Sequence, residues 1–476
     1  MKDIREKLFT QEKASHQKRQ WVRLTRCCNN RCIFCLDRSS QDGTFVPLKI
    51  IKEKLREGIK NGAERAVLSG GEPTLHPQFL EVVEFAKELG YKKVQIITNG
   101  RMFSYKGFLK KAIERGVDEI TFSIHGHTKK LYEVQSQVKG SFSQAMTGLI
   151  NALSCKGLIV NIDIVINKIN YRRLPEIIKF FMGLGVYEFD LLQIIPFGDA
   201  WKNKKKVFYK IEDALPYLKR AFKISHDSRV HLWTNRFPPP YLEGFEDLIQ
   251  DPVKLYDEVK GREGLFNKFL REDKLMPCWR ERCKWCFLKD FCFQLLLVKN
   301  PETKRDFSKK SVTLIKNEND IKKINFDQKG CFEIAINKRT KDWILRNLKK
   351  LYKFRDKIVF FQENHRLLSQ SKKNDINLRG FFSKVKLPGF KIKNIPICLY
   401  PKGEIVTEED SNISEIYRGG FIDIYKYTDW FILKKYYTKS IRCRKCKYFK
   451  SCPGVHINYI RNFGYKILKP IKTIKK

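Results

Sequence analysis

The sequence predicts an α/β protein in which a parallel sheet is followed by a cysteine-rich α+β region. Between about residues 21 and 200, six short β-rich runs alternate with stretches whose apolar residues recur at three- and four-residue steps. Six such strand–helix repeats imply right-handed crossovers and a parallel sheet. In folds of this kind the chemistry gathers where the strands end. The residues directly after each expected strand are therefore the first candidates for a site.

The expected strands are short and rich in branched and aromatic residues. Glycines end the helical patterns between them, as at Gly90, Gly116 and Gly157, where a left-handed C-terminal cap suits glycine. The expected strands are Trp21–Arg26, Ala66–Ser69, Val94–Thr98, Ile120–Ile124, Ile159–Ile166 and Phe189–Ile195.

The chain is expected to divide into five parts: an N-terminal extension, the sheet domain, a largely helical bridge, and two cysteine-rich regions. The bridge contains Phe237-Pro238-Pro239-Pro240, which is a stiff, extended break. The five parts are residues 1–20, 21–200, 201–275, 276–330 and 331–476.

The composition is that of a protein from a reducing compartment, and we expect it in the cytoplasm. Its 14 cysteines in 476 residues are too sparse for a disulfide miniprotein and too clustered for scattered core thiols. The first 20 residues are charged and lack the apolar core of a secretory signal. No run of about 18 or more apolar residues occurs, so no membrane span is expected.

The formal net charge is +43, and the C-terminal third carries most of it. Residues 301–476 hold 42 lysines and arginines against 17 aspartates and glutamates, a net of +25. A basic surface attracts polyanions or an acidic peptide by long-range steering. A lysine-rich composition with solvated faces explains the same charge, so both interpretations stay open.

Three cysteines follow the first expected strand, with the spacing Cys28-x3-Cys32-x2-Cys35. Three thiolates can hold three irons of a four-iron cluster and leave the fourth iron open. Clusters that only carry electrons usually have four cysteine ligands, so an open position indicates a cluster that binds a substrate or cofactor. The adjacent Cys27 falls outside the spacing and is expected to be a packed thiol.

Three further polar motifs follow the next three strands. Glycines in Ser69–Pro77 let the backbone approach a ligand closely, and Glu72 could accept from a ligand ammonium group. Thr98-Asn99-Gly100 follows the third strand, and Ser123–His127 offers short polar groups after the fourth. Taken alone, each motif has an ordinary explanation: Gly-Gly-Glu-Pro and Asn-Gly are common turns, and a cysteine triad could hold structural zinc. Their order and spacing together favour a cofactor site.

A second cysteine pattern occurs twice in the C-terminal part. Cys283-x2-Cys286-x5-Cys292 recurs as Cys443-x2-Cys446-x5-Cys452, and each copy has an earlier cysteine shortly after a proline. The two earlier cysteines are Cys278 and Cys398. Two copies of one pattern suggest two metal sites. Cys155 and Cys331 stand alone and are expected to be core residues.

The four strand-end motifs together resemble the radical S-adenosylmethionine (radical SAM) superfamily over about residues 18–200. The resemblance implies a partial (β/α)6 radical SAM barrel, in which Cys28, Cys32 and Cys35 bind a 4Fe-4S cluster. The open iron would chelate the amino and carboxylate groups of S-adenosylmethionine. One electron from the reduced cluster would then give methionine and a 5′-deoxyadenosyl radical, which abstracts hydrogen from a substrate.

The resemblance also assigns cofactor contacts. Ser123 matches the usual position of a ribose contact. The Gly-x-Ile-x-Gly pattern of the family's fifth strand is not visible in Asn161–Asn167, so no adenine contact is assigned. The residues that match the motif supporting the methionine amino group are Gly70, Gly71, Glu72 and Pro73.

The C-terminal cysteines resemble auxiliary-cluster domains of the SPASM/twitch type, which carry C-x2-C-x5-C-x3-C. The fourth position falls on His456 in one copy and on Leu296, which cannot ligate, in the other. Either His456 is a ligand or an upstream cysteine completes the site, and we favour Cys398. The resemblance thus implies two auxiliary 4Fe-4S clusters, with structural zinc as the alternative for each set. The implied ligands are Cys278, Cys283, Cys286, Cys292, Cys398, Cys443, Cys446 and Cys452.

Three functions stay open. The leading hypothesis is a radical SAM oxidoreductase that modifies a peptide or protein, with an electron donor such as flavodoxin or ferredoxin. The second is a radical SAM enzyme acting on RNA, and the third is a non-catalytic, metal-stabilised nucleic-acid-binding protein. Aromatic residues of the basic C-terminal third would suit RNA by stacking on bases. These aromatics are Trp343, Tyr352, Phe354, Phe360, Phe361, Phe381 and Phe382.

Overall fold

The computed structural model of the chain falls into two compact units. An N-terminal unit extends to Phe237 and includes Lys284–Phe287, and a C-terminal unit contains Pro238–Cys283 and the residues from Leu288 onward. The division lies at the start of the proline run after Phe237. The structure describes residues 16–272, 276, 278–299, 312–322, 324–327, 330–406 and 413–472.

The N-terminal unit is built on a seven-stranded sheet in which sequence order and spatial order agree. Every neighbouring pair of strands is parallel. The predicted α/β fold is therefore confirmed, and each of the six expected strands is present within two residues of its expected bounds, with β7 added. The strands are β1 (Arg19–Thr25), β2 (Arg65–Gly70), β3 (Lys93–Thr98), β4 (Glu119–Ser123), β5 (Ile159–Ile166), β6 (Glu188–Gln193) and β7 (His231–Asn235).

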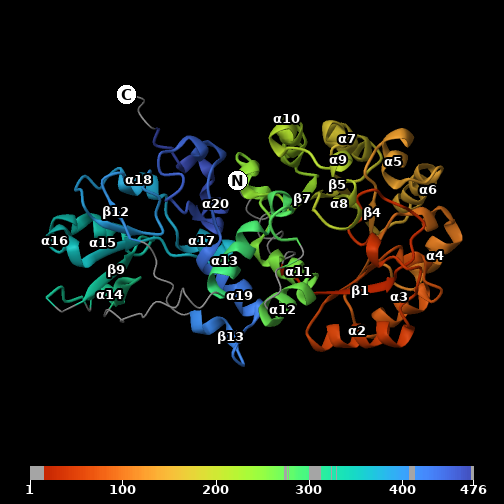
Figure 1. The fold of residues 1–476 in the computed structure, drawn as a ribbon, viewed down its shortest axis with the longest axis horizontal. Helices are drawn as coiled ribbons and strands as arrows, with labels where there is room; N and C mark the ends of the chain where they lie inside the picture. The colour runs from red at the N-terminus through yellow and green to blue at the C-terminus, as the bar shows by residue number, and fades with distance from the viewer. Residues whose placement is uncertain are drawn as a thin grey trace. The chain divides into compact units, whose positions relative to one another are not determined.

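Helices cover the outer face of this sheet (Figure 1). Each has an apolar face that packs inward, as in α3, where Phe79, Val82, Val83 and Ala86 are buried. Burying one such large apolar side chain contributes about 1.5–3 kcal/mol. The helices are α2 (Leu48–Lys60), α3 (Phe79–Glu88), α4 (Lys106–Glu114), α5 (Lys129–Ser136), α6 (Ser141–Leu153), α7 (Leu174–Gly183) and α10 (Ile211–Phe222).

The strands alternate between a packed face and an open face. In β5 the side chains of Ile162, Ile164 and Ile166 are fully buried, whereas Asn161 and Asp163 on the other face keep partial exposure. Right-handed crossovers between strands in sequential order place the helices on one face. The polar residues of β5 therefore lie on the face that the helices leave open, and the loops at the strand ends border it.

The segment predicted as a helical bridge is mostly helical but also contributes β7. It contains α8 (Gly198–Lys202), α9 (Lys204–Val207) and α10 before β7, and α11 (Leu255–Lys260) and α12 (Glu263–Glu272) after it. β7 was not predicted because its five residues, His-Leu-Trp-Thr-Asn, carry little apolar alternation.

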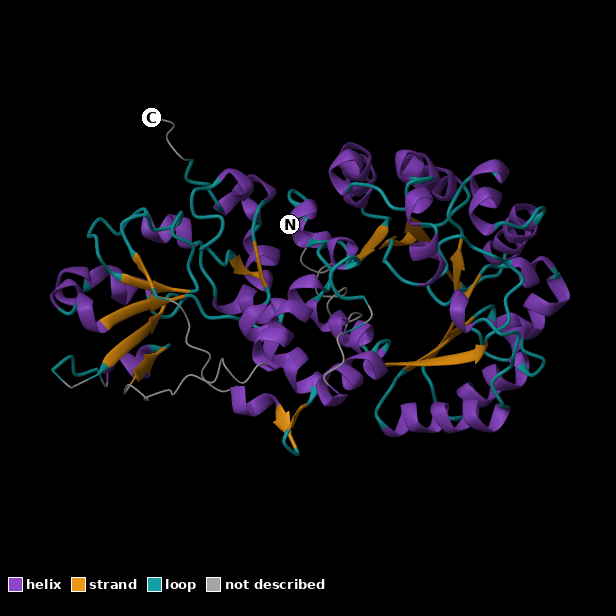
Figure 2. Ribbon diagram, viewed as in Figure 1, coloured by secondary structure: helices purple, strands orange, loops and turns teal. Residues whose placement is uncertain are grey.

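The C-terminal unit contains a second sheet (Figure 2). Its spatial order is β12-β11-β10-β9-β8, and every neighbouring pair is parallel. Its strands are β8 (Val312–Ile315), β9 (Cys331–Ala335), β10 (Ile358–Phe361), β11 (Lys391–Lys393) and β12 (Glu404–Ile405). Helices α14 (Glu318–Lys322), α15 (Lys341–Arg346), α16 (Leu348–Lys353), α17 (Leu368–Asn374) and α18 (Leu378–Phe382) connect these strands.

The rest of the C-terminal unit is assembled from shorter pieces. Besides α11 and α12, its helices are α13 (Lys289–Lys299), α19 (Ile424–Trp430) and α20 (Ile457–Phe463). Its two antiparallel pairs join β13 (Tyr417–Arg418) to β14 (Phe421–Ile422) and β15 (Tyr437–Thr438) to β16 (Val455–His456).

Several aromatic residues considered for RNA stacking are core residues of this unit. Phe360, Phe361, Phe381 and Phe382 are each at most 6% exposed. Phe360 packs against Phe390, and Phe382 stacks on Tyr400. Buried rings cannot stack on bases, so these four give no support to RNA binding.

Within the described residues, no helix has the length and apolar character that crossing a membrane would require.

Candidate metal and cofactor site

The three cysteines of the predicted triad lie close together in the loop that follows β1. Burial raises the pKa of Cys28 to about 12, a shift to which nearby Glu72 and the thiols of Cys35 and Cys27 contribute. Burial also raises the pKa of Cys32, with Cys28 and Cys35 adding to the effect. Three neighbouring thiols of this kind ionise readily only when a cation compensates their charge. The donor set therefore fits a metal cluster.

The cysteine loop is held by hydrogen bonds from other strand ends and from α5. The backbone N–H of Arg31 donates to Ser136 O over 2.9 Å, and that of Ile33 donates to Gln135 O over 3.0 Å. After β3, Asn99 Nδ2 donates to Asn29 Oδ1 over 2.6 Å. The loop position is therefore fixed by residues that are distant in the sequence.

The Gly-Gly pair after β2 allows that loop to touch the cysteine loop. A Cβ atom on Gly71 would lie 2.1 Å from the carbonyl oxygen of Cys27, and Gly70 has a φ of 139°. The same carbonyl accepts a 2.8 Å hydrogen bond from Glu72 N. Pro73 is buried and begins the short 3₁₀ turn η2 (Pro73–Leu75). Glycine is needed at position 71 because the two backbones touch.

Glu72 is buried at 1% exposure and joins the ends of β2 and β3. Its Oε1 accepts from Thr74 N (3.2 Å), Thr74 Oγ1 (2.5 Å) and Thr98 Oγ1 (2.7 Å), and its Oε2 accepts from Asn99 N (2.7 Å). Burial raises the pKa of Glu72, and these hydrogen bonds oppose the rise. Because a carboxylate has about four lone-pair sites, Oε2 keeps room for a ligand donor. The partners in β3 could not be predicted from the motif alone.

The motif after β4 divides into two kinds of residue. Ser123 ends β4, is partly exposed, and pairs in register with Asp163 of β5. His125 is buried, and its Nδ1 accepts from Val165 N over 3.1 Å, so it fastens the loop to β5. Burial lowers the pKa of His125 to about 4. His127 Nδ1 is buried without a hydrogen-bond partner.

Four C-terminal cysteines line one cavity in the C-terminal unit. Burial raises the pKa of Cys443 to about 11, a shift to which the thiols of Cys398, Cys446 and Cys452 contribute. The other walls are mostly apolar. The lining residues besides the cysteines are Pro396, Ile397, Lys439, Tyr448, Phe449, Gly454, Leu468 and Pro470. Four gathered thiols in an apolar surround fit a fully ligated cluster.

His456 is engaged elsewhere. It is 1% exposed, its Nε2 makes a 2.8 Å hydrogen bond to Ile432 O, and its Nδ1 accepts from Asn458 N at 3.4 Å. Burial lowers its pKa to about 4. Both ring nitrogens thus have protein partners, whereas Cys398 lies with the three later cysteines.

For the other predicted set of four cysteines, the structure shows fewer contacts between the members. Cys283 Sγ lies 3.7 Å from Cys278 O, and the Cys283 thiol is close enough to raise the pKa of Cys278, which burial raises most. Cys292 lies on α13. Cys286 belongs to the N-terminal unit, whereas the other three belong to the C-terminal unit.

A single zinc ion needs closely spaced ligands. Zn–S bonds of about 2.3 Å would bring four thiolates to within roughly 4 Å of one another. In the part of the chain that the structure describes, no three His, Cys, Asp or Glu side chains are grouped in a way that could hold one metal ion. A four-iron cluster spaces its thiolates more widely.

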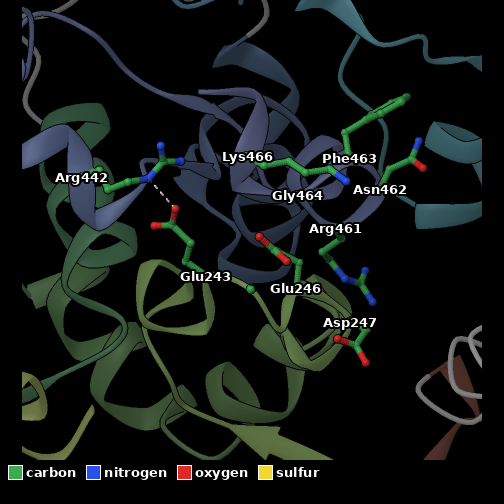
Figure 3. Close-up of a pocket in the computed structure, with 10 residues that line it drawn as sticks. Glu243, Glu246, Asp247, Arg442, Arg461, Asn462, Phe463, Gly464 and Lys466 are labelled. Carbon is green, nitrogen blue, oxygen red and sulfur yellow. Dashed lines mark hydrogen bonds and ion pairs between the residues drawn. The ribbon is translucent and has the colours of Figure 1, made fainter. Parts of the chain in front are cut away.

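A further pocket of about 660 Å³ in the C-terminal unit contains none of the predicted site residues (Figure 3). Its charged side chains are largely paired with protein groups. Arg442 Nε lies 2.7 Å from Glu243 Oε1, and Arg461 Nη1 lies 3.0 Å from Asp251 Oδ2.

Comparisons with known proteins identify the family of the chain. The sequence family described as the radical SAM superfamily matches residues 22–181. A protein of Sulfurisphaera tokodaii named "Probable GTP 3′,8-cyclase" is 30% identical over 237 residues, which is 49% of this chain and 72% of that protein. One of the same name from Saccharolobus solfataricus is 29% identical over 178 residues, covering 37% of this chain and 57% of that protein. The chain belongs to the radical SAM superfamily.

Two solved structures show partial similarity. Streptococcus suis SuiB bound to precursor peptide SuiA aligns with a TM-score of 0.37 and 18% identity, over 48% of this chain and 52% of that one. The structure of anSMEcpe with bound AdoMet and Kp18Cys peptide aligns with a TM-score of 0.38 and 18% identity, over 45% of this chain and 63% of that one. The chain thus spans about half of SuiB and somewhat less than two thirds of anSMEcpe.

Proposed function

We propose that the protein cleaves S-adenosylmethionine reductively and uses the resulting radical to modify a peptide or protein side chain. Cys28, Cys32 and Cys35 would hold the 4Fe-4S cluster that supplies the electron and the open iron. The observation that carries the proposal is the convergence of three partly buried thiols with the Gly71–Glu72 loop. The radical SAM class follows from family membership, and the substrate is the proposed part.

The residues around the triad would bind and orient the cofactor. Gly70, Gly71 and Pro73 shape the loop beside the cysteines, so their backbone is free to approach the methionine amino group. Glu72 would keep this loop rigid through Thr98 and Asn99, and its Oε2 could accept one ligand N–H. Ser123 would contact the ribose. Rigid placement of this kind matters because an error of 1 Å can cost about 100-fold in rate.

The C-terminal cysteines would hold auxiliary 4Fe-4S clusters. Cys398, Cys443, Cys446 and Cys452 would bind one, and their apolar surround suits electron transfer rather than substrate ligation. Cys278, Cys283, Cys286 and Cys292 would bind the other. An auxiliary cluster could take the electron left on a product radical, which favours net oxidation of the substrate. The basic C-terminal third would attract an acidic peptide segment.

Anaerobic reconstitution with iron and sulfide, followed by dithionite and S-adenosylmethionine, tests the class of chemistry. The wild type should release 5′-deoxyadenosine, and Cys32→Ala should reduce its release to background. Cys27→Ser is the matched control, because Cys27 lies beside the triad but outside its spacing. Equal activity of Cys32→Ala and wild type would overturn the assignment.

The second candidate substrate is GTP. It is favoured by the relatives named "Probable GTP 3′,8-cyclase", of which the first is 30% identical. GTP should then stimulate 5′-deoxyadenosine release and yield a cyclised nucleotide, detectable by mass spectrometry. Consumption of GTP would overturn the peptide proposal, whereas stimulation by a short peptide encoded next to the gene, with GTP inert, would support it.

RNA remains the third candidate substrate, with weaker support. Because four of the aromatic residues considered for base stacking are buried, the main support for RNA binding is the basic charge. Membership of a catalytic superfamily favours the enzymatic hypotheses over a non-catalytic nucleic-acid-binding role. Retention on a polyanion column at physiological salt, together with a modified nucleotide in RNA after turnover, would establish the RNA hypothesis in place of the peptide one.

A further inference from the structure

Gln41 places a side-chain amide against one sulfur of the triad. Its Nε2 lies 3.5 Å from Cys35 Sγ and donates a hydrogen bond to it. Among the described residues, Gln41 is the one side chain that donates to any of the three triad sulfurs. Cys28 Sγ receives a backbone donor instead, from Asn30 N at 3.4 Å. Cys35 thus differs from the other two thiols because a substitution can remove its side-chain hydrogen-bond donor.

The orientation of the Gln41 amide is fixed by Arg38. Arg38 Nη1 donates to Gln41 Oε1 over 2.9 Å, and a guanidinium has donors but no acceptor. The amide oxygen must therefore face Arg38, which turns the NH2 group toward the sulfur. Gln41 N also donates to Arg38 O over 3.1 Å, at the end of the 3₁₀ turn η1 (Arg38–Ser40). Both the backbone and the side chain of Gln41 are therefore held by Arg38.

The backbone of Cys35, which carries the accepting sulfur, is also held in place within the N-terminal unit. Asp199 N donates to Cys35 O over 2.8 Å. Gly198 has a φ of 55°, and a Cβ atom there would lie 2.3 Å from the same carbonyl oxygen. The chain at α8 therefore packs directly on the backbone of Cys35. Because donor and acceptor are both fixed, the contact is a built feature rather than a chance approach.

The charges around Cys35 disfavour adding an electron there. Two carboxylates lie near this sulfur: that of Asp37, two residues along the chain, and that of Asp199, whose N–H donates to Cys35 O. The Arg38 guanidinium acts in the opposite sense and lies 3.8 Å from Asp199 Oδ2. An amide donor adds positive potential at the sulfur without adding a charge.

We propose that Gln41 tunes the reduction potential of the triad cluster by its hydrogen bond to Cys35 Sγ. This inference rests on the proposed function, because it requires a cluster at the triad. The reduced cluster carries one more electron than the oxidised cluster, so a donor to its thiolate stabilises the reduced form more. The electron comes from an external reductant, and no proton transfer accompanies it. Gln41 is a positioning residue that makes the cluster easier to reduce.

The test is a redox titration of the reconstituted full chain, followed by electron paramagnetic resonance (EPR). The signal that changes on adding S-adenosylmethionine reports the triad cluster rather than an auxiliary one. Gln41→Met keeps the side-chain length but removes the N–H. At a fixed potential near the midpoint, the ratio of reduced to oxidised cluster should fall about three- to tenfold, and tenfold corresponds to 59 mV for one electron.

Two further variants complete the test. Gln41→Glu should lower the ratio at least as much, because it places a carboxylate beside the thiolate. Gln17→Met is the matched control: Gln17 precedes β1, whereas the triad follows it, and its Nε2 contacts Glu64 Oε2 at 3.3 Å. Its ratio should equal that of the wild type.

Unchanged midpoints in Gln41→Met and Gln41→Glu, at full iron content, would overturn the inference. If one variant failed to assemble the cluster, the other would decide. Absence of any signal that responds to S-adenosylmethionine in the wild type would instead count against the proposed function. The two failures are therefore distinguishable.

Discussion

The two gathered cysteine sites differ in number of thiols and in surroundings. The triad has three thiols, and the polar groups of Glu72, Asn99 and Gln41 lie in the loops around it. The C-terminal cavity has four thiols, and its other walls are mostly proline, aliphatic and aromatic side chains. Three thiols with polar neighbours suit a cluster that binds a ligand at an open iron. Four thiols in an apolar cavity suit a closed cluster.

The largest expected effect on the rate comes from adding a side-chain atom where the loop after β2 touches the cysteine loop. In Gly71→Ala, the new Cβ would meet the Cys27 carbonyl at 2.1 Å, so the two loops must separate. A displacement of about 1 Å should slow 5′-deoxyadenosine formation on the order of 100-fold. Gly107→Ala is the control, because a Cβ at Gly107 in α4 meets nothing within 4 Å. Equal rates in both variants would show that the contact does not position the site.

The four-cysteine site of the C-terminal unit is tested by comparing a variant of Cys398 with a variant of His456. Cys398→Ser should remove one cluster, about four irons per chain, because Cys398 lies with the three later cysteines. His456→Gln should keep the iron and lose about 1–3 kcal/mol of stability, because a buried hydrogen bond to Ile432 is disturbed. Iron analysis and chemical denaturation measure the two effects. Loss of iron only in the His456 variant would reverse the ligand assignment.

Substitution of Glu72 tests whether the polar residues around the triad form one hydrogen-bond network. In Glu72→Gln an NH2 group replaces an oxygen that accepts hydrogen bonds, so at least one buried donor loses its acceptor. The free energy of unfolding should fall by about 1–3 kcal/mol, and S-adenosylmethionine binding should weaken. Glu81→Gln, on the exposed side of α3, should change neither quantity appreciably. Unaltered stability in Glu72→Gln would mean that the carboxylate is dispensable to the loops.

A smaller effect is expected on the open face of the sheet. Asp163 and Asp190 are direct neighbours on β5 and β6, and burial with the Asp190 charge raises the pKa of Asp163 well above its ordinary value. The folded state therefore holds a proton that the unfolded state releases near pH 4, so Asp163 lowers stability as the pH rises above 4. Asp163→Asn should remove this loss and stabilise the protein by about 1 kcal/mol at pH 8.

The pH dependence supplies the check on this last prediction. The stability difference between Asp163→Asn and wild type should shrink as the pH falls toward 4 and should vanish only below it, where both states hold the proton. Urea denaturation at pH 4, 6 and 8 measures it. A difference that does not depend on pH would mean that Asp163 is ionised in the folded protein as well.

Local patterns predicted the N-terminal unit well because its strands carry five to eight residues of clear character. All six expected strands are present, and β5 has the predicted bounds. The C-terminal region was expected to be α+β, but the strands of its sheet were not located, because β11 and β12 have only three and two residues in a lysine-rich context. Strands that short give no periodic signal and form only through tertiary contacts.

The sequence singled out the residues of the candidate site but not the contacts between them. Spacing pointed to Cys28, Cys32, Cys35 and the Gly71–Glu72 motif, and each motif follows its expected strand. The partners of Glu72 after β3 depend on register, which no local pattern reports. Gln41 was missed for the same reason: it follows Cys35 in a polar loop without a motif, and only the folded turn brings its amide to the sulfur.

EPR of the reduced protein, with and without S-adenosylmethionine, tests the central claim most directly. If the triad holds a cluster with an open iron, adding S-adenosylmethionine should shift one cluster signal of the wild type. The shifted signal should be absent from Cys32→Ala, while signals of auxiliary clusters persist. A wild-type spectrum that S-adenosylmethionine leaves unchanged, at full iron content, would contradict the account.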